Sequence, residues 1–334
     1  MDKNILPQLA CPACQGPLAA GIQETRDGRI ISGSLECGRC RCKFPIIRGI
    51  ARFVENESYV ESFGYEWKDL FEWRTETDRD FREEEEIFRV KTGWTPEALR
   101  GRLVLDAGCG SGRYATVAAR WGARVVAVDM SLAVEKAKKI CENQDVSIIQ
   151  ADIMKLPFKN CSFDAAYSIG VLHHTGGTKN AFLRVAERVK PGGSLGAWFY
   201  RKNTALQEWL NSALRARTTK LPRESLIKFS KALARVAGIP GLNAALGRII
   251  NLGCTHPDFN RRFVDAFDWY SPTYQWHHTP EEVRSWFIEA GFEEIRELRP
   301  QKSGRIYDWT YRHNLLIGSG VNFLGLNKQN DKSE

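Results

Sequence analysis

The chain has 334 residues, 43% of them hydrophobic and 26% charged, with a formal net charge of +8 at pH 7. This length predicts two domains plus an insertion, with enough apolar side chains for a sizeable core. No uninterrupted apolar run reaches the ~18 residues of a transmembrane helix, and the first residues hold no apolar segment typical of a signal peptide. We expect a cytoplasmic protein, with peripheral membrane association as the alternative.

Two cysteine pairs stand near the N-terminus, and the residues of each pair are separated by two positions. Such pairs supply four thiolates at the corners of a tetrahedron, as in a structural zinc ribbon. The predicted ligands are Cys11, Cys14, Cys37 and Cys40. A hairpin around residues 26–28 would accommodate the spacer of 22 residues between the pairs. Disulfides are not expected, because reducing compartments disfavour them.

Residues 43–53 (Lys-Phe-Pro-Ile-Ile-Arg-Gly-Ile-Ala-Arg-Phe) complete this module. Together with the cysteine pairs they resemble the small zinc-ribbon family that activates tRNA and translation-factor methyltransferases, although Ala51 replaces the family's proline. The resemblance implies a supporting partner of a methyltransferase, here fused to it. A closed four-ligand metal site leaves no open position for catalysis. We assign residues 1–56 to a zinc-ribbon domain and expect no obligate protein partner.

The most informative motif follows an apolar run at 103–105, which ends in Asp106 and leads into three alternating glycines: Gly108, Gly110 and Gly112. Glycines at a strand-to-helix turn let the backbone approach a ligand and adopt positive φ. A second apolar run ends in Asp129, 23 residues after Asp106, a separation typical of an acid that binds ribose hydroxyls. The spacing differs from G-x-G-x-x-G, which disfavours nicotinamide and flavin dinucleotides.

This motif, L-D-x-G-C-G-x-G, resembles the class I S-adenosylmethionine (SAM)-dependent methyltransferases, of the methyltransferase type 11 kind. Later segments at 150–158, 162–174 and 189–195 continue the resemblance in order. The resemblance implies that the glycines line the methionine part of SAM, that Asp106 holds its amino end and that Asp129 takes the ribose. It implies these cofactor-binding residues: Asp106, Gly108, Gly110, Gly112, Asp129, Met130, Asp152, Ile153 and Ile169.

Strand-like and helix-like segments alternate through the centre of the chain. The expected strands cover 102–106, 125–129, 147–151, 163–170 and 193–200. This alternation predicts an α/β fold with a parallel sheet covered on both faces. The family resemblance implies a seven-stranded Rossmann-like sheet. We assign residues 57–98 to an N-terminal helical cap and residues 99–200 to the SAM-binding core.

Residues 201–265 read as a basic helical insertion that would lie over the substrate mouth. Ten Lys or Arg residues stand between positions 201 and 250 against two Glu residues, a net charge of +8. A basic amphipathic lid can bind a phosphorylated substrate, RNA or an anionic membrane surface. A solvated face on a packed helical cap explains the same charges equally well.

The chain closes with a capping box at 279–282 and two further expected strands, near 292–298 and 309–317. We assign residues 266–320 to the C-terminal part of the methyltransferase domain and residues 321–334 to a flexible tail.

Histidines near the expected acceptor position are candidates for catalysis. His173 and His174 follow the fourth strand, where a base of near-neutral pKa would deprotonate an acceptor. His277 and His278, within an aromatic cluster, are candidate substrate contacts, as is Tyr65 in the aromatic segment 62–73. Structural packing is the alternative for each of these side chains.

The sequence therefore predicts a SAM-dependent methyltransferase that contains structural Zn²⁺. The favoured acceptor is a small-molecule or lipid-linked metabolite, methylated on oxygen or carbon, because the region after the fourth strand lacks the Asn-Pro-Pro-Tyr-like motif of nitrogen methylation. The first alternative is a tRNA or rRNA methyltransferase that grips RNA with ribbon and lid. The second is a non-catalytic SAM-binding or RNA-binding adaptor.

Overall fold

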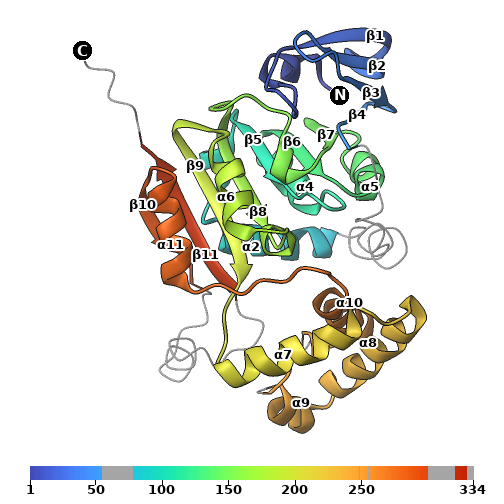
Figure 1. Ribbon diagram of the computed structural model, residues 1–334, viewed down its shortest axis with the longest axis vertical. Helices are drawn as coiled ribbons and strands as arrows, with labels where there is room; N and C mark the ends of the chain where they lie inside the picture. Colours follow the sequence, from blue (N-terminus) through green and yellow to red (C-terminus); the bar gives the residue numbers. More distant parts are fainter. Residues whose placement is uncertain (55–77, 248, 255, 300–319, 329–334) are drawn as a thin grey trace.

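A seven-stranded sheet forms the centre of the computed structural model, which describes residues 1–54, 78–247, 249–254, 256–299 and 320–328 (Figure 1). The strand order is β7-β6-β5-β8-β9-β11-β10, with β11 antiparallel to its neighbours β9 and β10. The strands are β5 (Leu103–Ala107), β6 (Arg124–Asp129), β7 (Val146–Gln150), β8 (Phe163–Ile169), β9 (Val189–Tyr200), β10 (Phe292–Glu297) and β11 (Gly320–Asn327). The predicted Rossmann-like sheet is confirmed.

Helices cover both faces of this sheet. One face carries α2 (Asp78–Thr92), α3 (Pro96–Leu99), α4 (Arg113–Arg120) and α5 (Ala133–Ile140), and the other carries α6 (Thr178–Ala186) and α11 (Pro280–Glu289). The side chains of β5 alternate between the two cores: Leu103 and Leu105 pack on the α6 side and Val104 on the α4 side. Burial on both faces explains why this strand is apolar throughout.

The N-terminal module extends the same sheet to eleven strands. It consists of a short 3₁₀ segment η1 (Lys3–Gln8) and the antiparallel strands β1 (Leu18–Arg26), β2 (Arg29–Cys37), β3 (Lys43–Ile47) and β4 (Ile50–Arg52). Strand β4 pairs in parallel with β7, with Ala51 opposite Ile149 and Arg52 opposite Gln150. The module is therefore joined to the core by backbone hydrogen bonding as well as by the chain.

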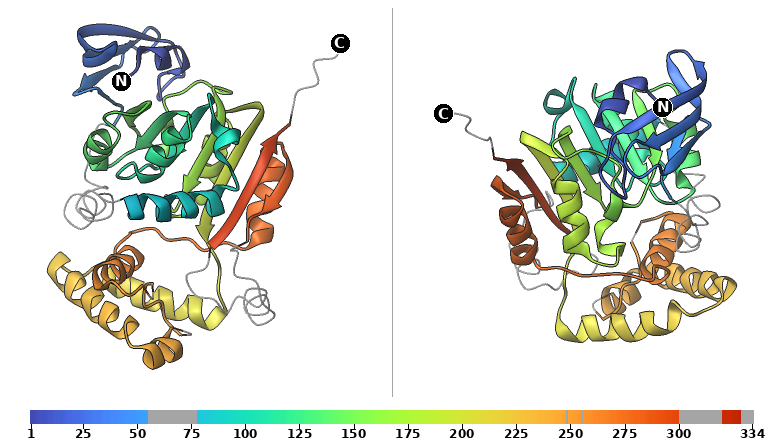
Figure 2. Two further views of the ribbon diagram at one scale, coloured as in Figure 1. Left: turned by 180° about the vertical axis from the view of Figure 1, so that it is seen from behind. Right: turned by 45° about the horizontal axis from the view of Figure 1, so that its top comes forward.

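Four helices form a separate lobe, the helical lobe, beyond the carboxyl end of β9. They are α7 (Ala205–Thr218), α8 (Arg223–Ala237), α9 (Pro240–Leu246) and α10 (Phe259–Tyr270). Their shared core includes Leu226, Phe263 and Tyr270. Figures 1 and 2 place the ribbon module and the helical lobe at opposite ends of the molecule. None of the described helices is long and apolar enough to cross a bilayer.

One of the two hydrogen bonds of the predicted capping box forms before α11. The Thr279 hydroxyl accepts a hydrogen bond of 3.2 Å from the Glu282 amide, and Pro280 occupies the first helical position. Gly291, with φ +82°, follows the end of the helix. Proline and glycine thus mark the two ends of this helix as the sequence indicates.

Two predicted domain boundaries are wrong. Residues 321–334 were expected to be a flexible tail, but β11 occupies Gly320–Asn327 and fills the slot between β9 and β10. The boundary at 265/266 falls inside α10, which packs on α8 and belongs to the helical lobe. The expected strand at 309–317, and residues 57–77 of the expected cap, lie outside the described residues.

Candidate functional site

A cavity of about 380 Å³ lies beyond the carboxyl ends of β5, β6, β7, β8 and β9. Its first half, termed the cofactor half, contains predicted SAM contacts: Gly108, Gly110, Asp129, Met130, Asp152, Ile153 and Ile169. Its second half, termed the acceptor half, is lined by Lys91, His174, Thr175, Gly176, Trp198, Tyr200, Asp265, Asp268 and Tyr274. Ligands of parallel sheets bind at this edge because the strand-end loops converge there.

The glycine turn brings bare backbone to the cofactor half. Gly108 has φ +93°, and a Cβ there would lie 2.4 Å from the γ-carbons of Val171. The third glycine of the motif has a different role: Gly112 is the N-cap of α4 and does not line the cavity. A Cβ on Gly112 would meet Ala137 and Cys141 of α5 and its C-cap at 3.1 Å. Thus two of the three glycines face the cavity, and the third allows close helix packing.

Asp129 is the most rigidly held carboxylate in the cofactor half. One oxygen accepts hydrogen bonds from the Ser131 amide (2.9 Å) and hydroxyl (2.7 Å), and the other accepts from the Gly110 amide (2.9 Å). These donors fix the carboxylate at the end of β6. The remaining lone pairs could accept hydrogen bonds from a diol.

Asp106 lies at the end of β5 but behind the cavity wall rather than in it. Burial raises its pKa to about 8, an effect that Tyr167 and Arg113 only partly offset. Its Oδ2 atom has no hydrogen-bond partner among the described residues. The family resemblance implies that Asp106 holds the amino end of SAM, but in this structure the residue does not line the cavity.

Three other predicted cofactor contacts also line the cavity. The Asp152 carboxylate accepts a hydrogen bond of 2.8 Å from the Met154 amide and so caps the short turn η3 (Ile153–Lys155). Ile153, which is 6% exposed, and Ile169 offer apolar contact. An acid beside aliphatic side chains can hold the amino group and the ring of an adenine.

Aromatic side chains from β9 form one wall of the acceptor half. Trp198 and Tyr200 stand two residues apart and point to the same face, with their ring centroids 5.3 Å apart. The ammonium of Lys91, from α2, lies 4.0 Å from the Trp198 ring centroid. The sequence analysis missed all three residues, although the period-2 spacing of two aromatics at a strand end was a usable signal.

The helical lobe supplies the opposite wall. Asp265 and Asp268 stand three residues apart on α10, so both lie on the side of this helix that faces the cavity. Tyr274 follows in the segment that returns to the sheet. These residues were also missed, because nothing in their local sequence distinguishes them from other polar positions on an amphipathic helix. None of the cavity-lining residues comes from positions 201–250, the basic stretch.

The two histidines after β8 have different surroundings. His174 lines the acceptor half, and its Nδ1 lies 2.9 Å from the carbonyl oxygen of Tyr274. Because a carbonyl only accepts, Nδ1 carries the proton and Nε2 is the basic nitrogen. Burial lowers the pKa of His174 to about 4. His173 is fully buried outside the cavity, with its ring centroid 4.0 Å from that of Tyr200. The geometry therefore favours His174 as the functional residue.

His277 and His278 do not line the cavity. His277 Nδ1 lies 2.7 Å from the Glu208 carboxylate on α7, and His278 Nδ1 lies 3.2 Å from Glu282 on α11. The first pair joins the return segment to the helical lobe and the second holds this segment to α11, so packing explains both histidines. Tyr65, the third candidate substrate contact, lies outside the described residues.

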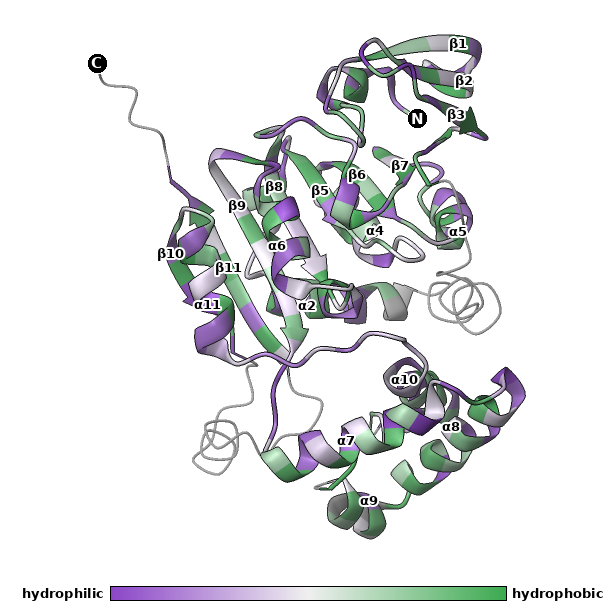
Figure 3. Ribbon diagram, in the orientation of Figure 1, coloured by the Kyte–Doolittle hydropathy of each residue, from purple (hydrophilic) through white to green (hydrophobic). Residues whose placement is uncertain are grey.

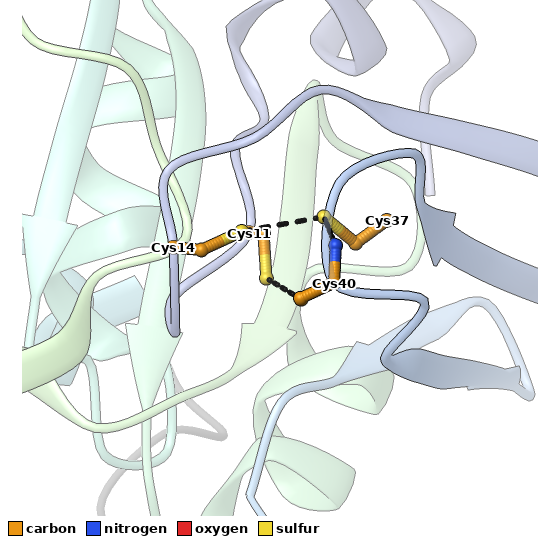
Figure 4. A group of neighbouring side chains, drawn as sticks. All are labelled: Cys11, Cys14, Cys37 and Cys40. Atoms are coloured by element: carbon orange, nitrogen blue, oxygen red, sulfur yellow. Dashed lines mark hydrogen bonds between the residues drawn. The ribbon is translucent and has the colours of Figure 1, made fainter.

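The four predicted metal ligands converge in the ribbon module (Figure 4). Their Sγ atoms all lie within 4.8 Å of one another, with Cys11 3.6 Å from Cys40 and Cys14 3.5 Å from Cys37. A tetrahedral zinc ion with Zn–S bonds of about 2.3 Å requires sulfur atoms about 3.8 Å apart. The tetrad therefore fits such an ion.

Comparison with known proteins identifies two domains. Residues 105–197 match the family model described as a methyltransferase domain, and residues 2–49 match that of a Trm112p-like protein. An uncharacterized methyltransferase of Mycobacterium tuberculosis (strain H37Rv) is 40% identical over 98 residues, which cover 29% of this chain and 50% of that protein. The chain thus spans about half the length of curated relatives of this kind.

Two further relatives have more specific names. A tRNA (carboxymethyluridine(34)-5-O)-methyltransferase of Arabidopsis thaliana is 35% identical over 96 residues, covering 28% of this chain and 22% of that protein. The solved structure of magnesium protoporphyrin IX methyltransferase from Synechocystis PCC 6803 aligns with 81% of this chain and 98% of its own, with 17% identity and a TM-score of 0.46. By its two family matches, this chain carries a Trm112p-like domain followed by a methyltransferase domain.

Proposed function

We propose that this protein is a SAM-dependent methyltransferase that acts on a compact small-molecule or lipid-linked acceptor, at oxygen or carbon. One observation carries the proposal: a single cavity joins the predicted SAM contacts to an aromatic compartment whose charged lid residues are acidic. A ligand in the cofactor half and an acceptor in the other half would meet inside this enclosed space. Such alignment accounts for much of the catalysis of a displacement reaction.

The cofactor half fits SAM by its donor set. Asp129 would accept from the ribose hydroxyls and Asp152 from the adenine amino group, whereas Asp106 lies behind the cavity wall. Bound SAM would supply an electrophilic methyl group: an acceptor oxygen or carbon would bond to the methyl carbon as its bond to sulfur breaks, and the neutral thioether S-adenosylhomocysteine would leave. The chain needs only to position the acceptor and remove its proton.

Side chains of the acceptor half can both position the acceptor and remove its proton. Trp198 and Tyr200 offer flat apolar surfaces that exclude water and orient a ring or chain. His174, neutral at pH 7, presents Nε2 as the base that accepts the acceptor's proton, while Tyr274 fixes its tautomer through Nδ1. A base with a pKa of about 4 is weak, so its main contribution is to orient the acceptor hydroxyl.

A tRNA or rRNA acceptor is the second candidate, supported by the Trm112p-like match and the Arabidopsis relative. The charge distribution opposes it. Although Lys91 and Arg113 line the cavity, residues 201–250 place no cation there, and the lobe contributes two carboxylates, which repel phosphates. The ribbon and the lobe also lie at opposite ends of the molecule, so a joint grip would require an RNA that spans the sheet (Figure 2).

We further propose that Zn²⁺ occupies the cysteine tetrad in a structural role. Four thiolates close the coordination sphere, which leaves no site for a substrate. Free thiolates persist in reducing compartments, so the tetrad is consistent with a cytoplasmic location.

The test follows labelled methyl from SAM into a cell extract that is then separated into RNA, organic and aqueous small-molecule fractions. The proposal expects nuclease-resistant label in the organic or aqueous fraction. Asp129→Ala, which loses a SAM contact, is the negative control. Nuclease-sensitive label in the RNA fraction would show that the acceptor is RNA, the second candidate, rather than a metabolite. No transfer, together with no rise in melting temperature on adding SAM, would favour a non-catalytic adaptor instead.

A further inference from the structure

The helical lobe and the segments that join its helices hold many of the large exposed apolar side chains of the described structure. The described residues include twelve large exposed apolar side chains, and six of them fall within positions 201–250: Leu206, Trp209, Leu221, Ile239, Leu242 and Ile249. Figure 3 shows apolar colouring over much of α7, α8 and α9. Scattered exposed apolar residues are ordinary, but a concentration of them marks an interaction surface.

The exposed face of α7 shows how these side chains are arranged. Leu206 and Trp209, three residues apart, are 64% and 65% exposed, and Ala216 continues the same side of the helix. Arg217, in the last turn of α7, and Lys220, just after the helix, extend this face and are also exposed. Glu208 is the single acid of α7, and its carboxylate is bound to His277. Helix α7 therefore presents an apolar and basic face, termed the α7 face, outward.

The position of this face relates it to the cavity. A groove of about 330 Å³ runs between α7 and the segment that returns to the sheet, and it is lined by Ser212, Ala216, Thr219 and Trp276 among others. Tyr274 lines both the groove and the acceptor half of the cavity. The groove beside α7 and the acceptor half are therefore adjacent, with Tyr274 between them.

We propose that the α7 face docks on an anionic lipid bilayer and presents the acceptor half to a lipid-linked substrate. Leucine and tryptophan side chains on a helix insert at the interface between headgroups and acyl chains, while neighbouring lysines and arginines bind anionic headgroups. This inference rests on the proposed function for the identity of the acceptor. The docking itself can be measured without any methyl transfer.

Two other occupants fit the surface less well. An RNA would pair with Arg217 and Lys220, but phosphates gain nothing from the aliphatic Leu206. A second copy of this chain would bring the same cations together, which opposes self-association. A bilayer satisfies the apolar and the basic residues at once.

The experiment measures co-sedimentation of the full chain with vesicles of phosphatidylcholine alone and of phosphatidylcholine mixed with phosphatidylglycerol. We expect binding at least ~10-fold tighter to the anionic vesicles, and we expect it to weaken with salt. The double variant Leu206→Ser, Trp209→Ser should weaken anionic vesicle binding at least ~10-fold. The double variant Arg217→Gln, Lys220→Gln should weaken it about fivefold per charge.

Matched controls come from exposed residues elsewhere. Ile288→Ser removes an apolar side chain that is 59% exposed on α11, and the double variant Arg26→Gln, Arg41→Gln removes two exposed ribbon cations. Both should bind vesicles as the unaltered chain does. Circular dichroism and the SAM-induced melting shift verify that each variant is folded and still binds cofactor.

Equal effects of the control and α7 variants, or no preference for anionic vesicles, would overturn the proposal. Tight binding of tRNA that Leu206→Ser, Trp209→Ser leaves unchanged, without vesicle binding, would overturn it in favour of RNA. If vesicle binding is confirmed but no lipid is methylated, docking stands and the proposed lipid-linked acceptor fails. The two failures are thereby distinguishable.

Discussion

The cofactor half and the acceptor half of the cavity are built in different ways. The predicted contacts of the cofactor half come from turns that directly follow β5, β6, β7 and β8, and the backbone holds them: the Gly110 and Ser131 amides bind Asp129, and the Met154 amide binds Asp152. The acceptor half collects side chains from α2, the segment after β8, β9, α10 and the segment after α10, and its rings pack mainly on one another. Backbone fixes the first half and tertiary packing fixes the second.

Glycine substitutions should show the largest difference between the two halves in their effect on the free energy of unfolding. Gly108→Ala places a Cβ 2.4 Å from the Val171 side chain at a φ of +93°. We expect a loss of roughly 3 kcal/mol in the free energy of unfolding, and no melting shift with SAM. Gly176→Ala, in the acceptor half, meets no atom within 4 Å and should stay within ~0.5 kcal/mol of the unaltered chain. Urea denaturation with and without SAM measures both, and equal losses would contradict the distinction.

Aspartates provide the next contrast. Asp129→Ala removes the carboxylate that the Gly110 amide and Ser131 hold, and we expect the Kd for SAM to rise ~100-fold or more. Asp268→Asn should leave the Kd for SAM within ~2-fold and lower kcat/KM for the acceptor by ~10-fold. Titration calorimetry and methyl-transfer rates measure the two quantities. A weakened SAM affinity in Asp268→Asn would show that the halves are not independent.

The same difference explains what the sequence could predict. Seven of the nine predicted cofactor contacts line the cavity, because turns after consecutive parallel strands meet at one sheet edge whatever the side-chain packing. Gly112 and Asp106 lie behind the cavity wall. The motif identifies the residues that the turn requires, but it does not show which of them face the cavity and which support it. Asp265 and Tyr274 reach the cavity only after the lobe folds back. No local pattern reports that long-range contact.

Histidine variants test the acceptor half alone. His174→Gln removes the imidazole that orients the acceptor hydroxyl in the cavity, and we expect kcat to fall ~100-fold with the Kd for SAM unchanged. His173→Phe keeps a ring in the buried aromatic cluster and should retain kcat within ~3-fold. If His173→Phe alone abolished transfer, the functional assignment would move to His173. Steady-state rates and SAM titrations of both variants decide the matter.

Buried groups near the two halves should make the free energy of unfolding depend on pH in opposite directions. Burial holds the pKa of His174 at about 4, below the usual 6.5, so the unfolded chain binds the extra proton and stability falls as pH drops from ~6.5 to ~4. Burial lowers the pKa of His173 as well, which adds to this slope. The raised pKa of Asp106, about 8, means that the folded chain keeps a proton that the unfolded chain loses, so stability falls as pH rises from ~4 to ~8.

Each slope is at most about 1.4 kcal/mol per pH unit per group, and one variant should remove each. Asp106→Asn should flatten the decline in stability above about pH 6, and His174→Gln should reduce the decline below it. Urea denaturation across this range, without SAM, provides the free energies. A variant that shifts stability equally at every pH would show that its group does not titrate as inferred.

We expect the smallest effect, a change in the Kd for SAM, when the ribbon module loses its metal. Arg52 of β4 donates a hydrogen bond of 2.7 Å to the Gln150 side chain, whose amide donates one of 3.0 Å to the carbonyl of Met130. Removal of the metal, by chelation or by Cys37→Ser, should unfold the ribbon and release this support. We expect the Kd for SAM to rise only ~3-fold, with the acceptor KM unchanged.

Cys42→Ser is the matched control, because Cys42 is not among the four converging thiols. It should retain one zinc per chain and unaltered SAM affinity. Metal analysis, followed by SAM titration of the metal-free chain, checks the prediction. Should the acceptor KM change more than the Kd for SAM, the ribbon would act on the acceptor half instead. Such a result would favour an acceptor large enough to touch both ends of the molecule, as RNA is, over the compact acceptor proposed here.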